Sequence, residues 1–430
     1  MEAWLLGIAL LLVFILAGVP IAFAMLVVGS VGVALMLNPT AALAMLGQIA
    51  YGTGLNYELS VVPLFILMGN LIVRAGLADE LYAASHAWLG HRRGGLAMST
   101  IVACGAFAAV CGSSLATAAT MARVAMPPMR RYGYSEALAA GAIAAGGTLG
   151  ILIPPSVILV LYGITTQQNI GELFLAGIIP GLIGILGYLA AIRATIWFRP
   201  AAGPSAERMP YRLRFSALSG VAGVLGLFAV VMGGIYLGIF TATEAAGIGA
   251  FGAFLIALVR RRLDPRSLYA VLLDTASTTA MMFFILIGAL LFSNFVNLAG
   301  LPGDLSGFIN GLELSPMAVL LAILGIYLLL GMVLESLSMV LLTVAIFYPI
   351  VSELGFDLIW FGIIVVVVTE ISLITPPIGL NVFVLNTVLK DVSVATIFRG
   401  VTPFIVADIV RLLVLVALPG LVLFLPHSMR

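Results

Sequence analysis

The stretches GGTLGILIPP, residues 146–155, and TEISLITPP, residues 369–377, decide how this chain folds. Each has a proline pair inside an apolar segment, and the two pairs are 376 − 154 = 222 residues apart. The same offset relates other positions, namely Pro127 and Pro349, Gly133 and Gly355, Tyr134 and Phe356, and Ser114 and Ser336. Proline removes a helix donor and clashes with the preceding turn, so each pair predicts a locally unwound helix. A unit of about 100 residues therefore occurs twice with a broken membrane helix in each copy, a pattern typical of secondary transporters.

The composition is that of a membrane protein. Of the 430 residues, 63% are hydrophobic and only 9% are charged, whereas soluble domains have about 25% charged residues. The mean hydropathy is +1.23. Long apolar runs recur from the first residues to the last, each able to cross about 30 Å of hydrocarbon. They predict an all-α polytopic membrane protein with about ten to twelve transmembrane helices.

Several function classes are excluded by what the sequence lacks. It has no Walker-type glycine loop followed by lysine, and Lys390 is its only lysine, so ATP is not the energy source within this polypeptide. A net charge of +1 without a basic tail predicts no nucleic-acid partner. The first apolar run has no basic n-region, so we expect a retained helix rather than a signal peptide. Cys104 and Cys111 lack further ligands nearby and are expected to pack as small apolar residues rather than form a disulfide or metal site.

Two apolar segments are interrupted in the middle and predict re-entrant hairpins. The first covers residues 94–129 and has Gly112-Ser113-Ser114 at its tip. The second covers residues 315–350 and has Glu335-Ser336 at its tip. From Ser113 to Pro154 the spacing is 154 − 113 = 41, and from Glu335 to Pro376 it is again 376 − 335 = 41. Each hairpin tip is therefore expected to face the unwound helix of its own copy.

The charges that flank the hairpins indicate opposite orientations. The first hairpin lies between His91-Arg92-Arg93 and Arg130-Arg131, whereas the second is followed by Glu353 and Asp357 with no basic residue nearby. Arginine and lysine favour the cytoplasmic side of a membrane. We therefore expect the first hairpin to enter from the cytoplasm and the second from the opposite side, as in an inverted repeat.

A polar, arginine-rich segment at residues 199–214 separates the two halves, and its charge places it in the cytoplasm. The predicted organisation has six parts. They are N-terminal scaffold helices, residues 1–75; a first inverted repeat, 76–198, with hairpin 94–129 and unwound helix 136–163; the linker, 199–214; scaffold and arm helices, 215–297; a second repeat core, 298–390, with hairpin 315–350 and unwound helix 357–388; and a C-terminal helix, 391–430.

The hairpin tips and unwound helices are expected to converge on one binding site near the membrane midplane. Freed carbonyls bind small hard cations, and half-helix N-termini direct a positive dipole end at an anion. Oxygen donors without His or Cys suit alkali or alkaline-earth ions rather than zinc or copper. Small residues also permit close helix packing, but two copies with identical spacing favour a site. The candidate substrate-binding residues are Gly112, Thr117, Pro154, Pro155, Glu335, Ser336, Pro376, Pro377 and Asn381.

A charged residue inside an apolar stretch costs about 2.5–3.5 kcal/mol at the helix centre, so its presence there needs a reason. Glu370 is expected either to bond freed backbone donors or to touch a ligand. Arg123 could meet a substrate carboxylate, although snorkelling or an internal pair is the simpler expectation. Asp408 and Arg411 are expected to form a local ion pair without a transport role. Glu244 is expected to support a helix N-terminus.

Four stretches resemble the large membrane (M) subunit of TRAP transporters, the tripartite ATP-independent periplasmic transporters. They are GSSLATAAT (residues 112–120), GGTLGILIPPSVILVLYG (146–163), TATEAAGIGA (241–250) and EISLITPPIGLNVFV (370–384). The resemblance covers essentially the whole chain, and TPPIGLN is its most specific string.

The resemblance implies a sodium-driven, elevator-type carrier in the bacterial inner membrane. It also implies two protein partners, a small four-helix membrane (Q) subunit and a periplasmic substrate-binding (P) protein that delivers a small organic anion. The implied sodium ligands are Ser113, Ser114, Gly147, Thr148 and Gly150 in the first repeat and Gly331, Thr369, Thr375 and Gly379 in the second. Related subunits commonly have Asp where this chain has Glu335, and that difference puts Glu335 in doubt as a direct ligand.

Sodium-coupled symport of an organic anion is therefore the expected function. A stand-alone sodium/dicarboxylate symporter of similar architecture is the alternative, and it would need no binding protein. A polytopic membrane enzyme is disfavoured, because the internal polar residues are mostly Ser and Thr and no His lies near them in the sequence.

The inverted repeat can be tested by labelling. Single cysteines introduced near Arg131 and near Asp357 should react with a membrane-impermeant maleimide from opposite sides of the membrane, because the flanking arginines orient only the first hairpin toward the cytoplasm. Labelling of both positions from the same side would contradict the inverted arrangement.

Overall fold

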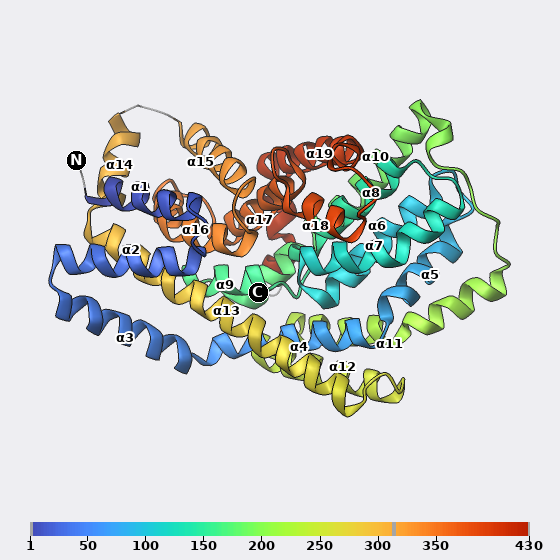
Figure 1. The fold of residues 1–430 in the computed structure, drawn as a ribbon, viewed down its shortest axis with the longest axis horizontal. Helices are drawn as coiled ribbons and strands as arrows, with labels where there is room; N and C mark the ends of the chain where they lie inside the picture. The colour runs from blue at the N-terminus through green and yellow to red at the C-terminus, as the bar shows by residue number, and fades with distance from the viewer. Residues whose placement is uncertain (1–2, 312–314, 429–430) are drawn as a thin grey trace.

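The structure is a computed structural model that describes residues 3–311 and 315–428. Residues 1–2, 312–314 and 429–430 belong to the predicted segments 1–75, 298–390 and 391–430 but lie outside the described residues. Helices make up almost all of the described chain (Figure 1). In the first half they are α1 (Ala3–Leu16), α2 (Ile21–Met36), α3 (Pro39–Leu55), η1 (Tyr57–Ser60), α4 (Val61–Arg74), α5 (Leu77–Leu89), α6 (Gly95–Cys111), α7 (Ser114–Arg131), α8 (Glu136–Thr148), η2 (Leu149–Ile151), α9 (Val157–Thr166) and α10 (Ile170–Phe198).

The second half follows the same order of helices. They are η3 (Pro200–Ala202), α11 (Tyr211–Tyr236), α12 (Ala242–Val259), α13 (Pro265–Leu298), α14 (Leu301–Gly311), α15 (Pro316–Gly331), α16 (Ser336–Glu353), α17 (Leu358–Ile374), α18 (Leu380–Val388), α19 (Val394–Ala417) and α20 (Gly420–Ser428). Seven of the described helices are long and apolar enough to cross a membrane individually, and seven shorter apolar helices accompany them. The all-α multi-pass class is therefore confirmed.

The repeat extends well beyond the unit of about 100 residues that the proline pairs indicate. Adding 222 to the bounds of α7 gives 336 and 353, which are the bounds of α16. The same shift moves α2 to 243–258, beside the 242–259 of α12, and α5 to 299–311, beside the 301–311 of α14. The correspondence therefore reaches back to the first helices, and the chain consists of two versions of one helix order.

The two versions are interleaved through equivalent contacts. Helix α2 packs on α13, and its equivalent α12 packs on α4. Likewise α9 packs on α16, and its equivalent α18 packs on α7. Each broken helix therefore continues onto the hairpin of the other copy, and neither copy is a separate unit.

The hairpins flank a central group of helices. Figure 1 shows α6 and α7 on one side of α8, α17, α18 and α19, and α15 and α16 on the other side. The long helix α13 runs diagonally across the molecule, and α2, α3 and α4 pack against it.

The segment 199–214 is part of the fold and not a free linker. Gly94 N donates to Gly203 O at 2.8 Å, Ser135 N donates to Ala202 O at 2.9 Å, and Ala206 N donates to Gly90 O at 2.9 Å. These bonds hold both ends of the first hairpin. The segment also ends earlier than predicted, because Tyr211 already begins α11, and Arg214 is buried there with its Nε on Met209 O at 3.0 Å.

Helices α8 and α19 approach each other through two glycines. A Cβ atom on Gly400 would collide with the Ala137 carbonyl oxygen and lie 3.1 Å from Gly141 N. A Cβ atom on Gly141 would in turn collide with the backbone of Gly400. Since α8 belongs to the first copy and α19 to the second, backbone contact between glycines holds the two halves together.

We predict that Gly400→Ala lowers the thermal stability of the purified protein, because overpacking a close backbone contact costs about 1–3 kcal/mol. Gly226→Ala on α11 is the matched control, since a Cβ atom there meets nothing within 4 Å. A melting experiment in detergent should show a lower Tm for Gly400→Ala only. Equal Tm values for the two variants would contradict the close packing of α8 on α19.

Candidate ion and substrate site

The tip of the first hairpin is a two-residue turn between α6 and α7. Gly112 has a φ of +65°, a left-handed conformation that favours glycine. Ser113 caps α7, with its Oγ accepting from Ala116 N at 3.4 Å. The Ser113 carbonyl accepts from the Thr117 hydroxyl at 2.7 Å, and Ser114 is buried beside it.

This tip lies directly against the broken helix of the first copy. Helix α8 ends at Thr148, the chain tightens into η2, and α9 begins only at Val157. A Cβ atom on Gly150 would lie 2.6 Å from Ser113 O and 2.9 Å from Thr117 Oγ1. The lack of a side chain at Gly150 therefore lets the hairpin tip reach the unwound segment. Two further glycines make the same close approach, Gly112 to the Pro155 carbonyl and Gly147 to Ala118.

The second hairpin has a similar tip with different chemistry. Glu335 caps α16, accepting from Ser338 N at 3.1 Å and from the hydroxyls of Ser338 and Ser336 at 3.3 Å each. Because 113 + 222 = 335, Ser113 and Glu335 are equivalent caps of equivalent helices. Both carboxylate oxygens of Glu335 accept hydrogen bonds from its own hairpin.

The second hairpin meets its broken helix through Gly331. A Cβ atom on Gly331 would collide with the Ser372 hydroxyl and lie 2.9 Å from Met339 Sδ. Ser372 is the equivalent of Gly150, since 150 + 222 = 372. In the first copy glycines on both the broken helix (Gly150) and the hairpin (Gly112) permit the close approach, whereas in the second copy the approach to Ser372 depends on Gly331 of the hairpin.

The second broken helix ends at Ile374, and α18 starts at Leu380. The Thr375 hydroxyl donates to Ile371 O at 2.6 Å, and the Thr369 hydroxyl donates to Val365 O at 2.8 Å. Gly379 is left-handed, with a φ of +61°, and lies close to the carbonyls of Leu373 and Thr375. Backbone and hydroxyl oxygens therefore gather at this break.

The two proline pairs differ in exposure. Pro154 and Pro155 are buried, whereas Pro376 and Pro377 are exposed, and both pairs are joined by a cis peptide bond. The first break is therefore enclosed by protein, and the second is open at its proline pair.

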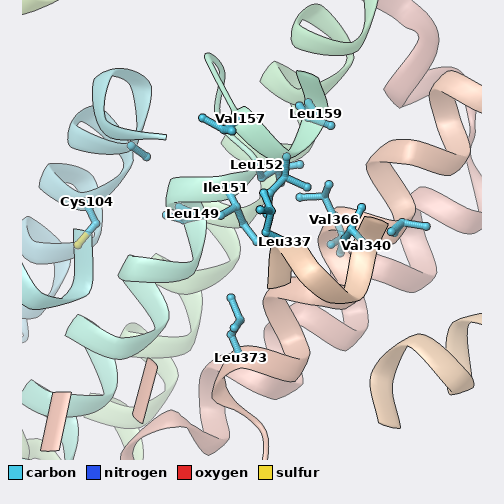
Figure 2. Packing of buried hydrophobic residues seen from close by; sticks show 14 of the residues in the cluster. Cys104, Leu149, Ile151, Leu152, Val157, Leu159, Leu337, Val340, Val366 and Leu373 are labelled. Atoms are coloured by element: carbon cyan, nitrogen blue, oxygen red, sulfur yellow. The ribbon is translucent and has the colours of Figure 1, made fainter. Parts of the chain in front are cut away.

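Asn381 links the second break to the first copy. Its side-chain amide donates to the carbonyl of Ala144 in α8 at 3.2 Å, and its Oδ1 has no hydrogen-bond partner among residues 3–311 and 315–428. Figure 2 shows Leu337 and Val340 of α16 in the same apolar cluster as Leu149, Ile151 and Leu152 at the first break. These contacts bring segments of the two copies together, and one shared binding site near the membrane midplane stays a prediction.

The ionisable residues agree with the sequence expectations in part. Glu370 is fully buried, and its Oε2 pairs with Arg411 Nη2 at 2.5 Å, a partner that the sequence does not suggest. No hydrogen bond from a backbone donor to Glu370 occurs within the described residues, and a ligand contact stays a prediction. Arg411 also pairs with Asp408 at 2.8 Å, so the expected local pair exists but is part of a larger network. Arg123 is exposed and forms no ion pair within the described residues. Glu244 forms a capping box with Thr241, as expected.

Cys104 and Cys111 are free cysteines. A Cβ atom on Gly146 would lie 2.7 Å from Cys104 Sγ, so that thiol packs against α8. This contact agrees with the expected packing role.

The donor atoms at the two breaks suit a hard cation. They are hydroxyl and carbonyl oxygens, and the described residues contain no group of three His, Cys, Asp or Glu side chains that could hold a metal ion. Such neutral oxygen sets suit alkali or alkaline-earth ions rather than zinc or copper. Sodium is one of the ions that these residues would fit.

Sequence reasoning missed two residues of this region, Ser372 and Tyr188. The repeat offset could have found Ser372, because it places this serine opposite Gly150. Tyr188 contacts the Thr148 hydroxyl at 3.1 Å, and no motif marks it. Its role depends on how α10 packs against α8.

Glu335→Ala should destabilise the protein by about 1 kcal/mol, because α16 loses its N-cap. Glu335→Ser should retain wild-type stability, since serine caps the equivalent helix α7. A thermal melt of both variants in detergent checks this ranking. A Glu335→Ser protein less stable than Glu335→Ala would contradict the capping role.

Comparison with known proteins agrees with this geometry. Residues 8–421 match the family model "Tripartite ATP-independent periplasmic transporter, DctM component". The C4-dicarboxylate TRAP transporter large permease protein DctM of Pseudomonas aeruginosa is 38% identical over 88% of this chain and 88% of its own length. The isethionate TRAP transporter permease protein DctMQ of Oleidesulfovibrio alaskensis is 33% identical over 96% of this chain and 64% of its own length.

A solved structure, the YdaH transporter of Alcanivorax borkumensis, has a similar fold with a TM-score of 0.68 at 13% identity, covering 98% of each chain. At that identity the likeness concerns the fold alone. The family match and the sequence identity to large permeases show to which family this chain belongs. The chain belongs to the DctM family of TRAP transporter large permeases, and it is a multi-pass transport protein of the bacterial inner membrane rather than an enzyme.

Proposed function

We propose that this permease performs sodium-coupled symport of a small organic anion, a carboxylate in chemical class, that a periplasmic binding protein delivers. The observation that supports the proposal is the pair of hairpins, each in contact with a broken helix that offers hydroxyl and carbonyl oxygens. Hydrogen bonds and glycine contacts hold these oxygens in place.

Sodium is proposed to bind at two half-sites. The first half-site consists of Ser113, Ser114, Gly147, Thr148 and Gly150, and the second of Gly331, Thr369, Thr375 and Gly379. In each, a hairpin meets the end of a broken helix, so an ion bound to both would favour the docked hairpin. An ion that binds one arrangement more tightly shifts the population toward it by its difference in affinity.

The substrate is proposed to bind beside these half-sites. Helices α7 and α16 begin at the hairpin tips, and the partial positive charge of a helix N-terminus attracts an anion. Gly112, Thr117, Pro154, Pro155, Glu335, Ser336, Pro376, Pro377 and Asn381 are the candidate contacts. The two relatives above are named for C4-dicarboxylates and isethionate, and both are small organic anions.

Two protein partners complete the proposed system, a small four-helix Q subunit and the soluble P protein. The family name describes a tripartite transporter, and the DctMQ relative is longer than this chain, which covers 64% of it.

We propose that the central helices and hairpins move as an elevator-type transport body against α13 and its neighbours. A stand-alone symporter would transport without the P protein, so reconstitution in liposomes with and without that protein separates the two possibilities.

Ser113→Ala and Ser114→Ala should weaken sodium binding, because each removes a neutral oxygen from the first half-site. Sodium chloride, titrated against choline chloride at constant ionic strength, should stabilise the wild-type protein in a thermal melt, since a ligand of the folded state raises Tm. We expect the half-saturating sodium concentration of the variants to rise about tenfold, the loss of about 1.4 kcal/mol of binding.

Ser135→Ala is the matched control, because Ser135 caps α8 as Ser113 caps α7 but lies outside the half-site. It should lose stability without a change in sodium response. An unchanged half-saturating sodium concentration in Ser113→Ala and Ser114→Ala would refute their assignment.

A further inference from the structure

A chain of buried polar side chains crosses the protein from the first broken helix to the second. We call it the Arg411 network, and it consists of Thr148, Tyr188, Asp408, Arg411 and Glu370. Arg411 is 2% exposed, and the other four side chains are 0% exposed. Buried charges are costly unless they are paired, so this arrangement requires a reason.

Every link in the network is within bonding distance. The Thr148 hydroxyl lies 3.1 Å from the Tyr188 hydroxyl, which donates to Asp408 Oδ2 at 2.7 Å. Arg411 Nη2 lies 2.8 Å from Asp408 Oδ1 and 2.5 Å from Glu370 Oε2. The guanidinium also lies 6.0 Å from the centre of the Tyr188 ring. One continuous set of contacts therefore joins helices α8, α10, α19 and α17.

The two ends of the network are equivalent positions in the repeat. Adding 222 to Thr148 gives Glu370, and α10 and α19, which supply the connecting residues, are equivalent helices. Thr148 belongs to the proposed first half-site, and Glu370 is adjacent to Thr369 of the second. The network thus connects the same place in both copies.

The direction of the hydrogen bonds determines what Thr148 can offer. An ionised Asp408 only accepts hydrogen bonds, so the Tyr188 proton is committed to it. The Thr148 hydroxyl then gives its own proton to Ala145 O, at 2.8 Å, or to Tyr188. Either way its oxygen lone pairs remain available to a cation.

Charge supports the same assignment at the other end. Two carboxylates share one guanidinium, and Glu370 Oε1, Asp408 Oδ1, Arg411 Nε and Arg411 Nη1 have no hydrogen-bond partner within the described part of the chain. With both carboxylates ionised, the group carries one excess negative charge, which a cation bound nearby would stabilise because electrostatic attraction is strong away from water. The neighbouring Thr369 is a proposed sodium ligand.

We infer that Tyr188, Asp408 and Arg411 are positioning residues that set the sodium affinity of both half-sites. They hold the Thr148 hydroxyl in a cation-accepting orientation and fix the carboxylate of Glu370, the residue that follows Thr369 in α17. This inference rests on the proposed sodium coupling and adds to it three residues that touch neither ion nor substrate.

Tyr188→Phe tests the inference, because it keeps the ring against Arg411 and Phe404 and removes only the hydroxyl. The complete permease, with its small subunit in lipid nanodiscs, is melted across a sodium chloride titration with choline as the replacing ion. We expect the half-saturating sodium concentration to rise at least about fivefold, the lower range of coupling between sites. A purely structural role would lower Tm at every sodium concentration and leave the half-saturating concentration unchanged.

Tyr162→Phe is the matched control. Tyr162 is equally buried, and its hydroxyl donates to Leu358 O at 2.5 Å, so the variant also removes one tyrosine hydroxyl that bonds between the copies. It should leave the half-saturating sodium concentration unchanged. Equal shifts in the two variants, or no shift in either, would overturn the inference.

Gly184→Ala keeps every network residue and provides a second test should Tyr188→Phe fold poorly. A Cβ atom on Gly184 would collide with Arg411 Nη1, whereas one on Gly187 of the same helix meets Ala407 at 3.8 Å, an ordinary contact. Gly184→Ala should raise the half-saturating sodium concentration, and Gly187→Ala should not. An unshifted Gly184→Ala protein would contradict the inference.

Failure of the proposed function gives a different result. A wild-type protein whose Tm does not respond to sodium would refute sodium binding itself. A wild-type protein that responds to sodium, with Tyr188→Phe and Gly184→Ala unshifted, would refute only the role of the network.

Discussion

Two helices are broken inside a protein that spans a membrane, and this constraint governs the rest of the structure. Backbone groups freed by a break cannot face lipid, because hydrocarbon offers no hydrogen bonds. Each break must therefore face protein or water. The hairpins pack against both breaks at close range, where Gly150 and Gly331 provide the space that a side chain would fill, while the second proline pair stays exposed. The same packing brings hydroxyl and carbonyl oxygens together at each break.

The two copies meet this constraint with different chemistry. Serine caps the first hairpin arm and glutamate caps the second, and the position that is Gly150 in the first broken helix is Ser372 in the second, where Gly331 of the hairpin provides the space. The same asymmetry separates Thr148 from Glu370, and the pairing of Glu370 with Arg411 follows from it. Duplication thus preserved the hairpin caps and the broken helices and not the residues that line them. The two proposed half-sites are therefore not chemically equivalent.

Much of the fold follows from the sequence, because its signals are local. A proline pair breaks a helix wherever it occurs, and a Gly-Ser turn in an apolar run marks a hairpin. The 222-residue offset could also have extended the repeat to α2 and α12, since their bounds differ by one residue after the shift. The segment 199–214 was harder to predict. Its polar composition is typical of a free linker, and only its backbone bonds to Gly94 and Ser135 show that it holds the first hairpin.

The sequence by itself determined the helical membrane class, the two breaks, the hairpin tips and the family resemblance, all of which depend on residues close together in the chain. Only the tertiary structure decided which side chains meet across it. Asp408 and Arg411 are three residues apart and predict a local pair, yet Arg411 also binds Glu370, 41 residues away, and Asp408 binds Tyr188, 220 residues away. Such partners depend on how α10, α17 and α19 pack together. No local pattern encodes that packing.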